Sequence, residues 1–354
     1  MDRKMLLEKL EVVAPALARS EFVPIMTHFW FTGTHVIAYD DTVGISLPLK
    51  TDFRGAVPGS ILLNLLKNSR GKLVEFKTDT KESKVFIHVG KKKSSKSKFK
   101  LALLPPEEFL FKFPKKLGKV SVVTDKFVEA IDWCLSSVGD DTSTPDQLGV
   151  TLVFGKDRVE LYSTNDATLC HAVWKGKCRA VTARLILSTA FCRLLSATAS
   201  KRIDISFSED GVLADLGKSG IRIFGRLVNS DRPLDFNEVM EQHYTKKIAS
   251  KLVTIPDRMM GIIDRAMVVT ESYNDPGFTK ISIESSKGSF ISTTSRGVVR
   301  DVVKFKIKHP DSEIIVDPKL LKPMLKMCDK MLITDSCIIF RNRSKFIHLI
   351  SARA

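Results

Sequence analysis

The chain has 354 residues, of which 44% are hydrophobic and 27% are charged. This length predicts two or three domains, and the composition excludes a disordered chain. No stretch is apolar enough to span a membrane and the N-terminus is charged, so we expect neither anchor nor signal peptide and a cytoplasmic protein. The six cysteines form no CxxC pair, which predicts reduced, buried thiols rather than disulfides.

The net charge of +16 is unevenly distributed along the chain. Residues 1–118 carry 21 basic and 12 acidic side chains, residues 119–248 carry 17 of each, and residues 249–354 carry 18 and 11. The two outer thirds are therefore basic and the middle third is neutral. Such a balance favours a polyanionic partner, most often nucleic acid.

The first third reads as helix, three strands, helix, three strands. Residues 5–17 form an amphipathic helix, and a second helix runs from Val57 to Gly71, with Pro58 in its first turn. Period-two apolar patterns bounded by turn residues predict the strands. These are expected at 26–31, 35–39, 43–49, 74–76, 85–89 and 99–104.

The same order occurs twice more. In the middle third we expect helices at 123–135 and from Thr182 onward, the latter carrying Leu185 and Ile186. In the last third, a helix starts near Pro256, with Met260, Ile263 and Met267 as its apolar face, and another starts at Asp317. Pro323 predicts a bend or a late start in the second of them. The corresponding strands are expected at 150–154, in a hairpin over 158–174 whose turn is Ser163–Asp166, and at 203–207, 211–215, 221–227, 280–284, 289–293, 298–305, 331–334, 338–341 and 346–350.

The recurring order indicates a true internal repeat. The equivalent turn residues Asp40, Asn165 and Ser295 lie 125 and 130 residues apart. The sequence therefore predicts three tandem α+β domains at 1–118, 119–248 and 249–354. In each of them we expect two helices on one side of an antiparallel sheet layer.

Four segments resemble a known family when they are taken in this order within the repeat. They read LLEKLEVVAPAL followed by VPIM, LALLPPEEF, STNDATLCHAV, and FGRLVNSDRPLDFNEVM. Together they resemble the bacterial-type DNA polymerase sliding clamp, the β-clamp processivity factor, over essentially the whole chain. Clamps of this kind are often acidic, so a charge of +16 indicates a divergent lineage, for which a virus is one candidate source.

The resemblance implies a head-to-tail homodimeric ring of clamp domains around duplex DNA, without an active site, cofactor or metal. It also implies action in the nucleoid or, for a viral protein, in the host cytoplasm. Basic side chains on or beside the predicted helices would hold phosphates without reading bases, although any one of them can equally be a solvated helix face. The candidate DNA contacts are Lys9, Arg19, Lys67, Arg70, Arg184, Arg193, Arg202, Arg258, Arg265, Lys319, Lys322 and Lys326.

The resemblance further implies a pocket that takes short peptides from a DNA polymerase and a clamp loader. Apolar walls with a few polar groups suit such an anchor site. In this chain TNDATL stands where the family has Thr-Asp-Gly-His-Arg-Leu, and the tail ISARA departs from the family's Met-Pro-Met-Arg-Leu, so a different peptide preference is expected. The matching positions are Leu148, Thr164, Leu169, Leu234, Val239, Ile338, Leu349, Ile350, Ser351 and Ala352.

The ring interface would join an edge of the first domain to an edge of the third. The first edge is basic, as the family's is, whereas the second offers only Glu271 and Asp301 as acids. Because both outer thirds are basic, we expect a ring held by apolar contact and strand pairing, and one that opens readily. The interface candidates are Lys98, Phe99, Lys100, Leu101, Val268, Val269, Glu271, Val298, Val299 and Asp301.

Two alternatives remain open from the residues. One is a DNA-binding scaffold of the same fold that never closes, and the other is a metal-dependent nuclease or repair enzyme whose acids meet only in space. The pairs Asp40-Asp41 and Asp140-Asp141 could serve such an enzyme, but each reads more simply as a turn. Gly217-Lys218-Ser219 lacks the spacing and the following helix of a phosphate-binding loop.

Overall fold

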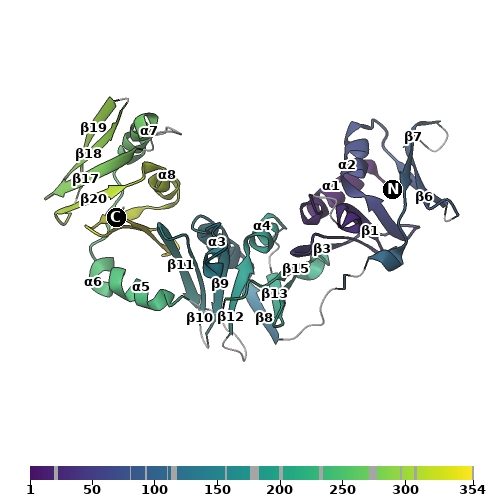
Figure 1. Cartoon of the computed structure of the whole chain (residues 1–354), viewed down its shortest axis with the longest axis horizontal. Helices are drawn as coiled ribbons and strands as arrows, with labels where there is room; N and C mark the ends of the chain where they lie inside the picture. Colours follow the sequence, from purple (N-terminus) through teal and green to yellow (C-terminus); the bar gives the residue numbers. More distant parts are fainter. Residues whose placement is uncertain are drawn as a thin grey trace. The chain divides into compact units, whose positions relative to one another are not determined.

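In the computed structural model the described residues fall into two compact units (Figure 1). Unit 1 comprises Met1–Glu129 with Leu187–Val228, and unit 2 comprises Ala130–Lys177, Thr182–Ile186 and Asn229–Ala354. No helix among the described residues is long and apolar enough to cross a membrane. The residues described are 1–19, 23–79, 81–91, 94–109, 111–112, 118–155, 158–175, 183–198, 202–230, 234–270, 277–295, 297–306 and 309–352.

Unit 1 is built on an eight-stranded antiparallel sheet in the order β4-β1-β2-β3-β15-β14-β13-β8. Four strands come from the first third of the chain and four from the middle third. At the centre β3 pairs with β15, and Ile45 lies opposite Ile223. The strands are β1 His28–Phe31, β2 His35–Tyr39, β3 Val43–Pro48, β4 Gly55–Pro58, β8 Gly118–Val123, β13 Arg202–Phe207, β14 Gly211–Asp215 and β15 Arg222–Arg226.

Both faces of this sheet are covered. Helix α1 packs on β2 and β3, α2 on β1 and β4, and α4 on β15. Gly225 admits the close approach of α4, because a Cβ there would lie 2.7 Å from the Phe191 side chain. Aromatic rings cover the opposite face, where Phe111 stacks on Tyr39 at 3.9 Å between ring centres. The remaining elements are α1 Arg3–Val13, α2 Gly59–Asn68, α4 Thr189–Thr198 and a three-stranded sheet of β5 Val74–Asp79, β6 Lys84–Lys91 and β7 Ser94–Ala102.

Unit 2 contains a second eight-stranded sheet, in the order β12-β9-β10-β11-β23-β22-β21-β16. Here strands from the middle third join strands from the last third, because β11 pairs with β23 and Leu169 lies opposite Leu349. The strands are β9 Gly149–Phe154, β10 Arg158–Thr164, β11 Thr168–Lys175, β12 Ala183–Ser188, β16 Val253–Thr254, β21 Lys330–Ile333, β22 Cys337–Arg341 and β23 Ile347–Ser351.

The helices of unit 2 lie on both faces of its main sheet. On one face α3 is fixed by Trp133, whose Nε1 donates to Ile347 O at 3.0 Å, and α8 packs on β23. On the other face Phe236 and Met240 of α5 are buried against Tyr162 and Leu169. The helices are α3 Thr124–Leu135, which runs across the boundary between the units, α5 Phe236–His243, α6 Lys246–Ala249, α7 Met259–Thr270 and α8 Pro318–Met327.

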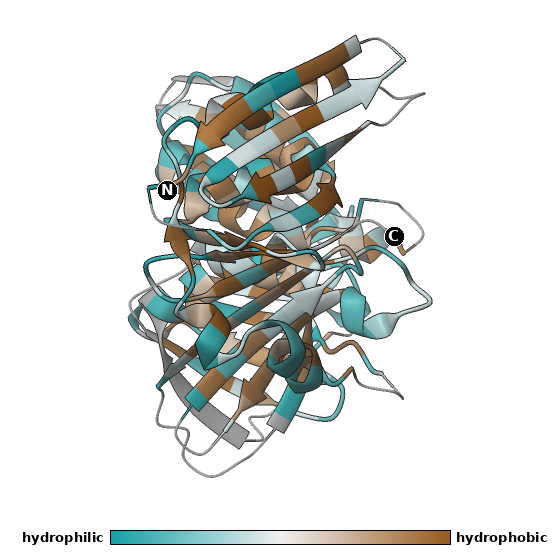
Figure 2. Cartoon of the chain, turned by 90° about the vertical axis from the view of Figure 1, so that its left-hand side faces the viewer, coloured by the Kyte–Doolittle hydropathy of each residue, from teal (hydrophilic) through white to brown (hydrophobic). Residues whose placement is uncertain are grey.

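A four-stranded sheet in the order β19-β18-β17-β20 completes unit 2. Helix α7 packs on α8 and against β18 and β19. Figure 2 views the chain from the side of this sheet, and apolar and polar segments alternate along its strands. Its strands are β17 Phe278–Glu284, β18 Lys287–Thr294, β19 Gly297–Lys304 and β20 Ser312–Val316.

The α+β content and the antiparallel sheets agree with the sequence, but several predicted elements need correction. Leu185 and Ile186 lie on strand β12, and the helix that follows begins only at Thr189. Helix α8 begins directly at Pro318, so the expected late start is wrong, and it contains Pro323. The helical face of α7 is Met259, Ile262, Ile263 and Ala266 instead of the predicted Met260, Ile263 and Met267. Strands β4, β8, β16 and β20 and helices α5 and α6 were not predicted. Val57 and Pro58, which were predicted to start a helix, lie on β4, and helix α2 begins at Gly59.

The predicted division into three domains stays a prediction. Each large sheet combines strands from two of the three repeats, so the compact units do not coincide with the repeats. The pairings of β3 with β15 and of β11 with β23 are the reason.

Candidate functional site

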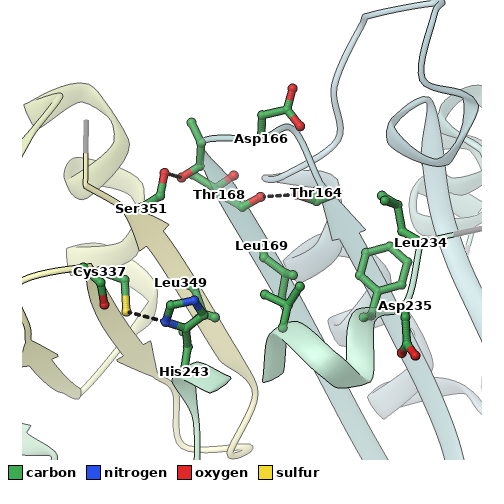
Figure 3. Close-up of a pocket in the computed structure, with 14 residues that line it drawn as sticks. Thr164, Asp166, Thr168, Leu169, Leu234, Asp235, His243, Cys337, Leu349 and Ser351 are labelled. Atoms are coloured by element: carbon green, nitrogen blue, oxygen red, sulfur yellow. Dashed lines mark hydrogen bonds between the residues drawn. The ribbon is translucent and has the colours of Figure 1, made fainter. Parts of the chain in front are cut away.

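Unit 2 contains a largely apolar cavity of about 290 Å³ between the β10–β11 hairpin, the ends of β22 and β23, and helix α5 (Figure 3). A cavity of this size, with apolar walls and a few polar groups, suits the anchor side chains of a peptide. It is lined by Thr164, Asp166, Ala167, Thr168, Leu169, Leu234, Asp235, Phe236, Val239, His243, Ser336, Cys337, Leu349 and Ser351.

The β10–β11 hairpin forms one wall of the cavity. Seven residue pairs hold its strands in register, from Arg158 opposite Lys175 to Thr164 opposite Leu169. In the turn, Asn165 Oδ1 accepts from the Thr168 backbone N–H at 2.9 Å, and Asp166 adopts a φ of 66°. Asn and Asp tolerate this left-handed region better than other non-glycine residues, which explains why NDA closes the turn.

Strand β23 brings the end of the chain against this hairpin. Leu349 lies opposite Leu169, and the Ser351 backbone N–H donates to Ala167 O at 2.9 Å. Because side chains alternate along a strand, Leu349 and Ser351 face the cavity while Ile350 points to the other face of the sheet. Cys337 lies opposite Ser351 on β22 and completes this wall.

Helix α5 forms the opposite wall. Asp235 caps the helix through Oδ1, which accepts from the backbone N–H groups of Asn237 and Glu238. Phe236 stacks on Tyr162 with 4.9 Å between ring centres, which anchors the helix to the sheet. Leu234 and Val239 at the rim are 39% and 37% exposed, so two apolar side chains are accessible to a ligand.

A buried polar network lies beneath this wall. Glu160 is 5% exposed, accepts from the Tyr162 hydroxyl, pairs with Arg158, and lies 3.5 Å from His171 Nε2. The neighbouring His171, together with Tyr162 and Arg158, holds the pKa of Glu160 below its usual value against the effect of burial. Burial and the Glu160 carboxylate raise the pKa of Tyr162 well above its usual value. The network therefore fixes Tyr162 under Phe236 with Glu160 charged and Tyr162 neutral.

The cavity itself contains no activated nucleophile among its described lining residues. Cys337 Sγ lies 3.9 Å from His243 Nδ1, but burial raises the pKa of the Cys337 thiol. A neutral thiol on an apolar wall contributes packing rather than chemistry. The cavity is therefore suited to binding.

Six of the ten predicted pocket residues line this cavity, namely Thr164, Leu169, Leu234, Val239, Leu349 and Ser351. Ile338 and Ile350 need correction: they lie opposite each other on β22 and β23, and both are fully buried in the other face of the sheet. Leu148 and Ala352 do not line the cavity either. Five lining residues with polar or titratable side chains were not predicted, namely Asp166, Asp235, His243, Ser336 and Cys337. The last four were missed because α5 and the β21–β22 turn were not recognised as walls, whereas Asp166 lies in the β10–β11 turn that was placed at the pocket.

A second, more polar cavity of about 330 Å³ lies on the other side of the segment Leu234–Phe236. Its cationic group, Arg184, donates to the buried Asp146 at 3.0 Å and lies over the Phe236 ring at 5.7 Å. Arg184 was expected beside a helix and lies instead on strand β12. Arg184 therefore packs against Phe236 of α5 from the side of strand β12.

The twelve predicted DNA contacts differ in what their side chains do. Four are engaged within the chain: Lys9 donates to Pro48 O at 2.7 Å, Lys67 pairs with Glu11 at 3.0 Å, Lys322 pairs with Asp264 at 2.9 Å, and Arg265 pairs with Asp301. Arg184 is a fifth. The side chain of Arg202 lies outside the described residues. The exposed members are Arg19, Arg70, Arg193, Arg258, Lys319 and Lys326.

The predicted interface residues lie on two edge strands. Lys98, Phe99, Lys100 and Leu101 belong to β7, at the edge of its three-stranded sheet, with both lysines exposed. Val298, Val299 and Asp301 belong to β19, at the edge of the four-stranded sheet, and Val268 and Val269 lie on α7. Val268 is 81% exposed and Val298 is 58% exposed. Glu271 lies outside the described residues.

The acidic pairs considered for metal chemistry behave as turn residues. Asp40 Oδ1 accepts from the backbone N–H groups of Thr42 and Val43, and Asp41 pairs with Arg226 at 2.7 Å. Asp141 Oδ1 accepts from the Ser143 N–H at 2.8 Å. Within the described ranges no three His, Cys, Asp or Glu side chains gather as metal ligands would. Gly217–Ser219 forms a short 3₁₀ turn between β14 and β15.

Comparison with known proteins identifies the fold. No protein-family model matches the chain, and no curated protein matches its sequence. Solved structures do match over its whole length. The DNA polymerase III β subunit of Thermotoga maritima shares 17% identity at a TM-score of 0.82, covering 100% of this chain and 98% of that one. The sliding clamp of Bacillus subtilis shares 16% at 0.83, and that of Pseudomonas aeruginosa 14% at 0.84, with the same coverage.

Because the sequence identities are only 14–17%, the similarity lies in the arrangement of the backbone rather than in shared residues. It extends over the whole of this chain and over 98% of each of these structures. The chain therefore has the fold of the bacterial DNA polymerase III β-subunit sliding clamps.

Proposed function

We propose that this protein is a DNA sliding clamp: a homodimeric ring that encircles duplex DNA without reading its sequence, holds a polymerase there, and performs no chemistry itself. The observation that carries the proposal is the full-length clamp fold together with a net charge of +16. A fold built for topological retention needs only sequence-independent phosphate contacts, and basic side chains supply them. Work at replicating DNA would place it in the cytoplasm.

The exposed basic residues of unit 2 support the DNA role. Lys319 and Lys326 on α8 and Arg258 just before α7 are exposed, whereas the apolar side chains of both helices pack inward. Side chains of this kind release counterions from DNA and give a binding constant that falls steeply with salt.

The apolar cavity supports the docking role. Two exposed apolar residues, Leu234 and Val239, stand over a floor that includes Leu169 and Leu349. A polymerase or loader would insert the apolar anchors of a short peptide there, as buried anchors carry most of the free energy in such interfaces.

Closure of the ring would use the edges of β7 and β19. Both are edge strands with backbone groups available for pairing, and Val268 and Val298 add exposed apolar surface. A double substitution Val268→Ser and Val298→Ser should shift the protein toward monomer in sedimentation velocity. Ile315→Ser is the matched control, because Ile315 is 44% exposed on β20, the other edge of the same sheet.

The topological claim is tested on a nicked circular plasmid. The protein is mixed with the plasmid under dilute conditions that dissociate dimers, then concentrated and washed at moderate salt. We expect the clamp to be released when a restriction enzyme linearises the plasmid. We expect it to be retained when bound protein blocks the ends of the linear DNA. Equal retention on open linear DNA would contradict a ring.

That contrary result would instead support a second candidate, a scaffold of the same fold that binds DNA without closing. One observation favours it: the only described acid of the predicted acidic edge, Asp301, is already paired with Arg265 of the same chain. Charge attraction between the edges is then weak, and the basic outer thirds repel each other.

A further inference from the structure

The charged groups that line the apolar cavity are of one sign. Among its fourteen lining residues there are two acidic ones, Asp166 and Asp235, and neither lysine nor arginine. This is unusual in a chain with 56 basic and 40 acidic residues. The sign of the rim must therefore influence which ligand the cavity accepts.

Both carboxylates are held in fixed positions by hydrogen bonds, Asp166 by a side chain and Asp235 by backbone N–H groups. Asp166 stands at the tip of the β10–β11 turn, and its Oδ1 accepts from Gln147 Nε2 at 2.5 Å. Asp235 Oδ1 accepts the two capping hydrogen bonds of α5. In each carboxylate Oδ2 accepts no hydrogen bond from the described residues, so it is available to an incoming donor.

The two groups lie at opposite ends of the cavity. Figure 3 shows Asp166 at one end and Asp235 at the other, with Leu169 between them. An extended peptide that crosses the cavity would therefore place its apolar anchors in the middle and its flanking side chains near a carboxylate at each end.

Helix α5 strengthens the negative field. Besides its cap it carries the exposed Glu238 and Glu241, and it contains neither lysine nor arginine. Arg184 on the sheet below is paired with Asp146, while Lys246 and Lys247 follow on α6. The N-terminal half of α5, which borders the cavity, thus carries Asp235 and Glu238 without a basic residue.

We propose that the cavity selects peptides in which Lys or Arg flanks the apolar anchors. This inference rests on the proposed docking function and specifies its partner as a linear peptide segment. Two apolar side chains of the segment would pack against the apolar lining residues Leu169, Leu349, Leu234 and Val239. A lysine or arginine of the segment would pair with Asp166, with Asp235 or, where there are two such residues, with both. Exposed ion pairs add little affinity, so each is worth about a twofold to fivefold change, and their main effect is to exclude acidic segments.

The test uses three labelled peptides with identical leucine and phenylalanine anchors and with Lys, Gln or Glu at both flanks. Binding to the full chain is followed by fluorescence anisotropy at low and at high salt. The Lys peptide is expected to bind about tenfold more tightly than the Glu peptide at low salt, and the ratio should shrink at high salt because these charges are exposed.

The variants are Asp166→Asn and Asp235→Asn. Asn also tolerates a positive φ and caps helices well, so both proteins should fold. In the double variant the Lys-to-Glu ratio should fall close to one, while the Gln peptide binds as before. Glu241→Gln, on α5 but outside the cavity lining, is the control and should leave the ratio near its original value.

The outcomes separate the two proposals. If no peptide binds at any salt concentration, the docking function itself fails. If all three bind equally, or the Glu peptide binds best, docking stands and the preference for cationic flanks is overturned. A preference that survives in the double variant would also overturn it, because the selection would then arise elsewhere.

Discussion

Arg265 on α7 and Asp301 on β19 form a two-pronged ion pair, with Nε 3.0 Å from Oδ2 and Nη2 2.7 Å from Oδ1. The sequence assigned the arginine to DNA and the aspartate to the ring interface. In the structure each is instead the partner of the other, and the pairing raises the pKa of Arg265 further. Both predicted roles are therefore weakened by one ion pair.

Breaking this pair by Asp301→Asn should release the Arg265 guanidinium to bind a phosphate. We expect the slope of log affinity for duplex DNA against log salt to steepen by up to about 0.9. Sedimentation should show the same dimerisation constant, since the pair leaves Asp301 little attraction for a second chain. Arg265→Gln is the control and should leave the slope near the wild-type value, because the paired guanidinium binds no phosphate to begin with. Marked loss of dimer in Asp301→Asn would show that the carboxylate contacts the partner chain after all.

Exposed and ion-paired cations should differ in their contribution to DNA binding. Replacing Arg258, Lys319 and Lys326 together by Gln is expected to reduce the salt slope by about 0.9 for each phosphate that is no longer neutralised. Replacing Lys322, which pairs with Asp264, should change it less. Fluorescence titration on a short duplex measures the slopes. Lys287→Gln with Lys304→Gln on the four-stranded sheet provides the control, and an equal reduction there would mean that charge alone, not position, sets the affinity.

The two faces of the sheet in unit 2 should respond differently to truncation. Leu234→Ala and Val239→Ala at the cavity rim should weaken peptide binding at nearly unchanged stability, because both side chains are more than one-third exposed. Ile350→Ala removes a fully buried side chain and should cost about 2–5 kcal/mol of unfolding free energy. Urea unfolding and anisotropy distinguish the two effects. Wild-type stability in Ile350→Ala would contradict its place in the core.

Acid should destabilise unit 2 through His348. Burial lowers the pKa of His348 to about 3, whereas a histidine in an unfolded chain titrates near about pH 6.5. As pH falls, the unfolded state takes up the proton first, so the stability is complete above about pH 6.5 and is lost toward pH 3. The slope is at most about 1.4 kcal/mol per pH unit. Burial also lowers the pKa of His309, which acts in the same direction.

Urea midpoints between about pH 7.5 and about pH 4.5 measure this slope. His348→Leu, which cannot take up a proton, should show a flatter profile than the wild-type protein, although its absolute stability will change. His88→Gln in unit 1 is the comparison and should follow the wild-type profile. A profile for His348→Leu as steep as the wild-type one would mean that other groups dominate.

The sequence predicted most strands but failed where short apolar runs are ambiguous. Leu185 and Ile186 lie in the run ARLILS, which a helix or a buried strand can equally adopt, and the strand was chosen by pairing in the sheet. Helix α5 was missed because the polar segment NEVMEQH has few apolar residues to show a period. Its stability comes from Phe236 and Met240 packing on the sheet, which no local pattern reveals.

The cavity was located by resemblance, but its lining required the register of the strands. Neighbouring residues of a strand face opposite sides of the sheet, so Leu349 lines the cavity whereas Ile350, which was also predicted, does not. On β22 the predicted Ile338 is one residue away from Cys337, which lines the cavity. The acidic character of the cavity rim could not be predicted from the sequence. Asp166 and Asp235 lie 69 positions apart in the chain, and only the fold brings both of them to the same cavity.

The central strand pairs β3–β15 and β11–β23 join strands of different predicted repeats within one sheet, so a single repeat is not a stable folding unit. A fragment cut at residue 118 would leave β3 without its neighbour, and one that starts at residue 249 would leave β23 without β11. Each would expose a bare strand edge, which invites aggregation. The predicted repeat boundaries therefore do not coincide with the borders of the compact units, and a gene truncated at one of them should not yield a stable fragment.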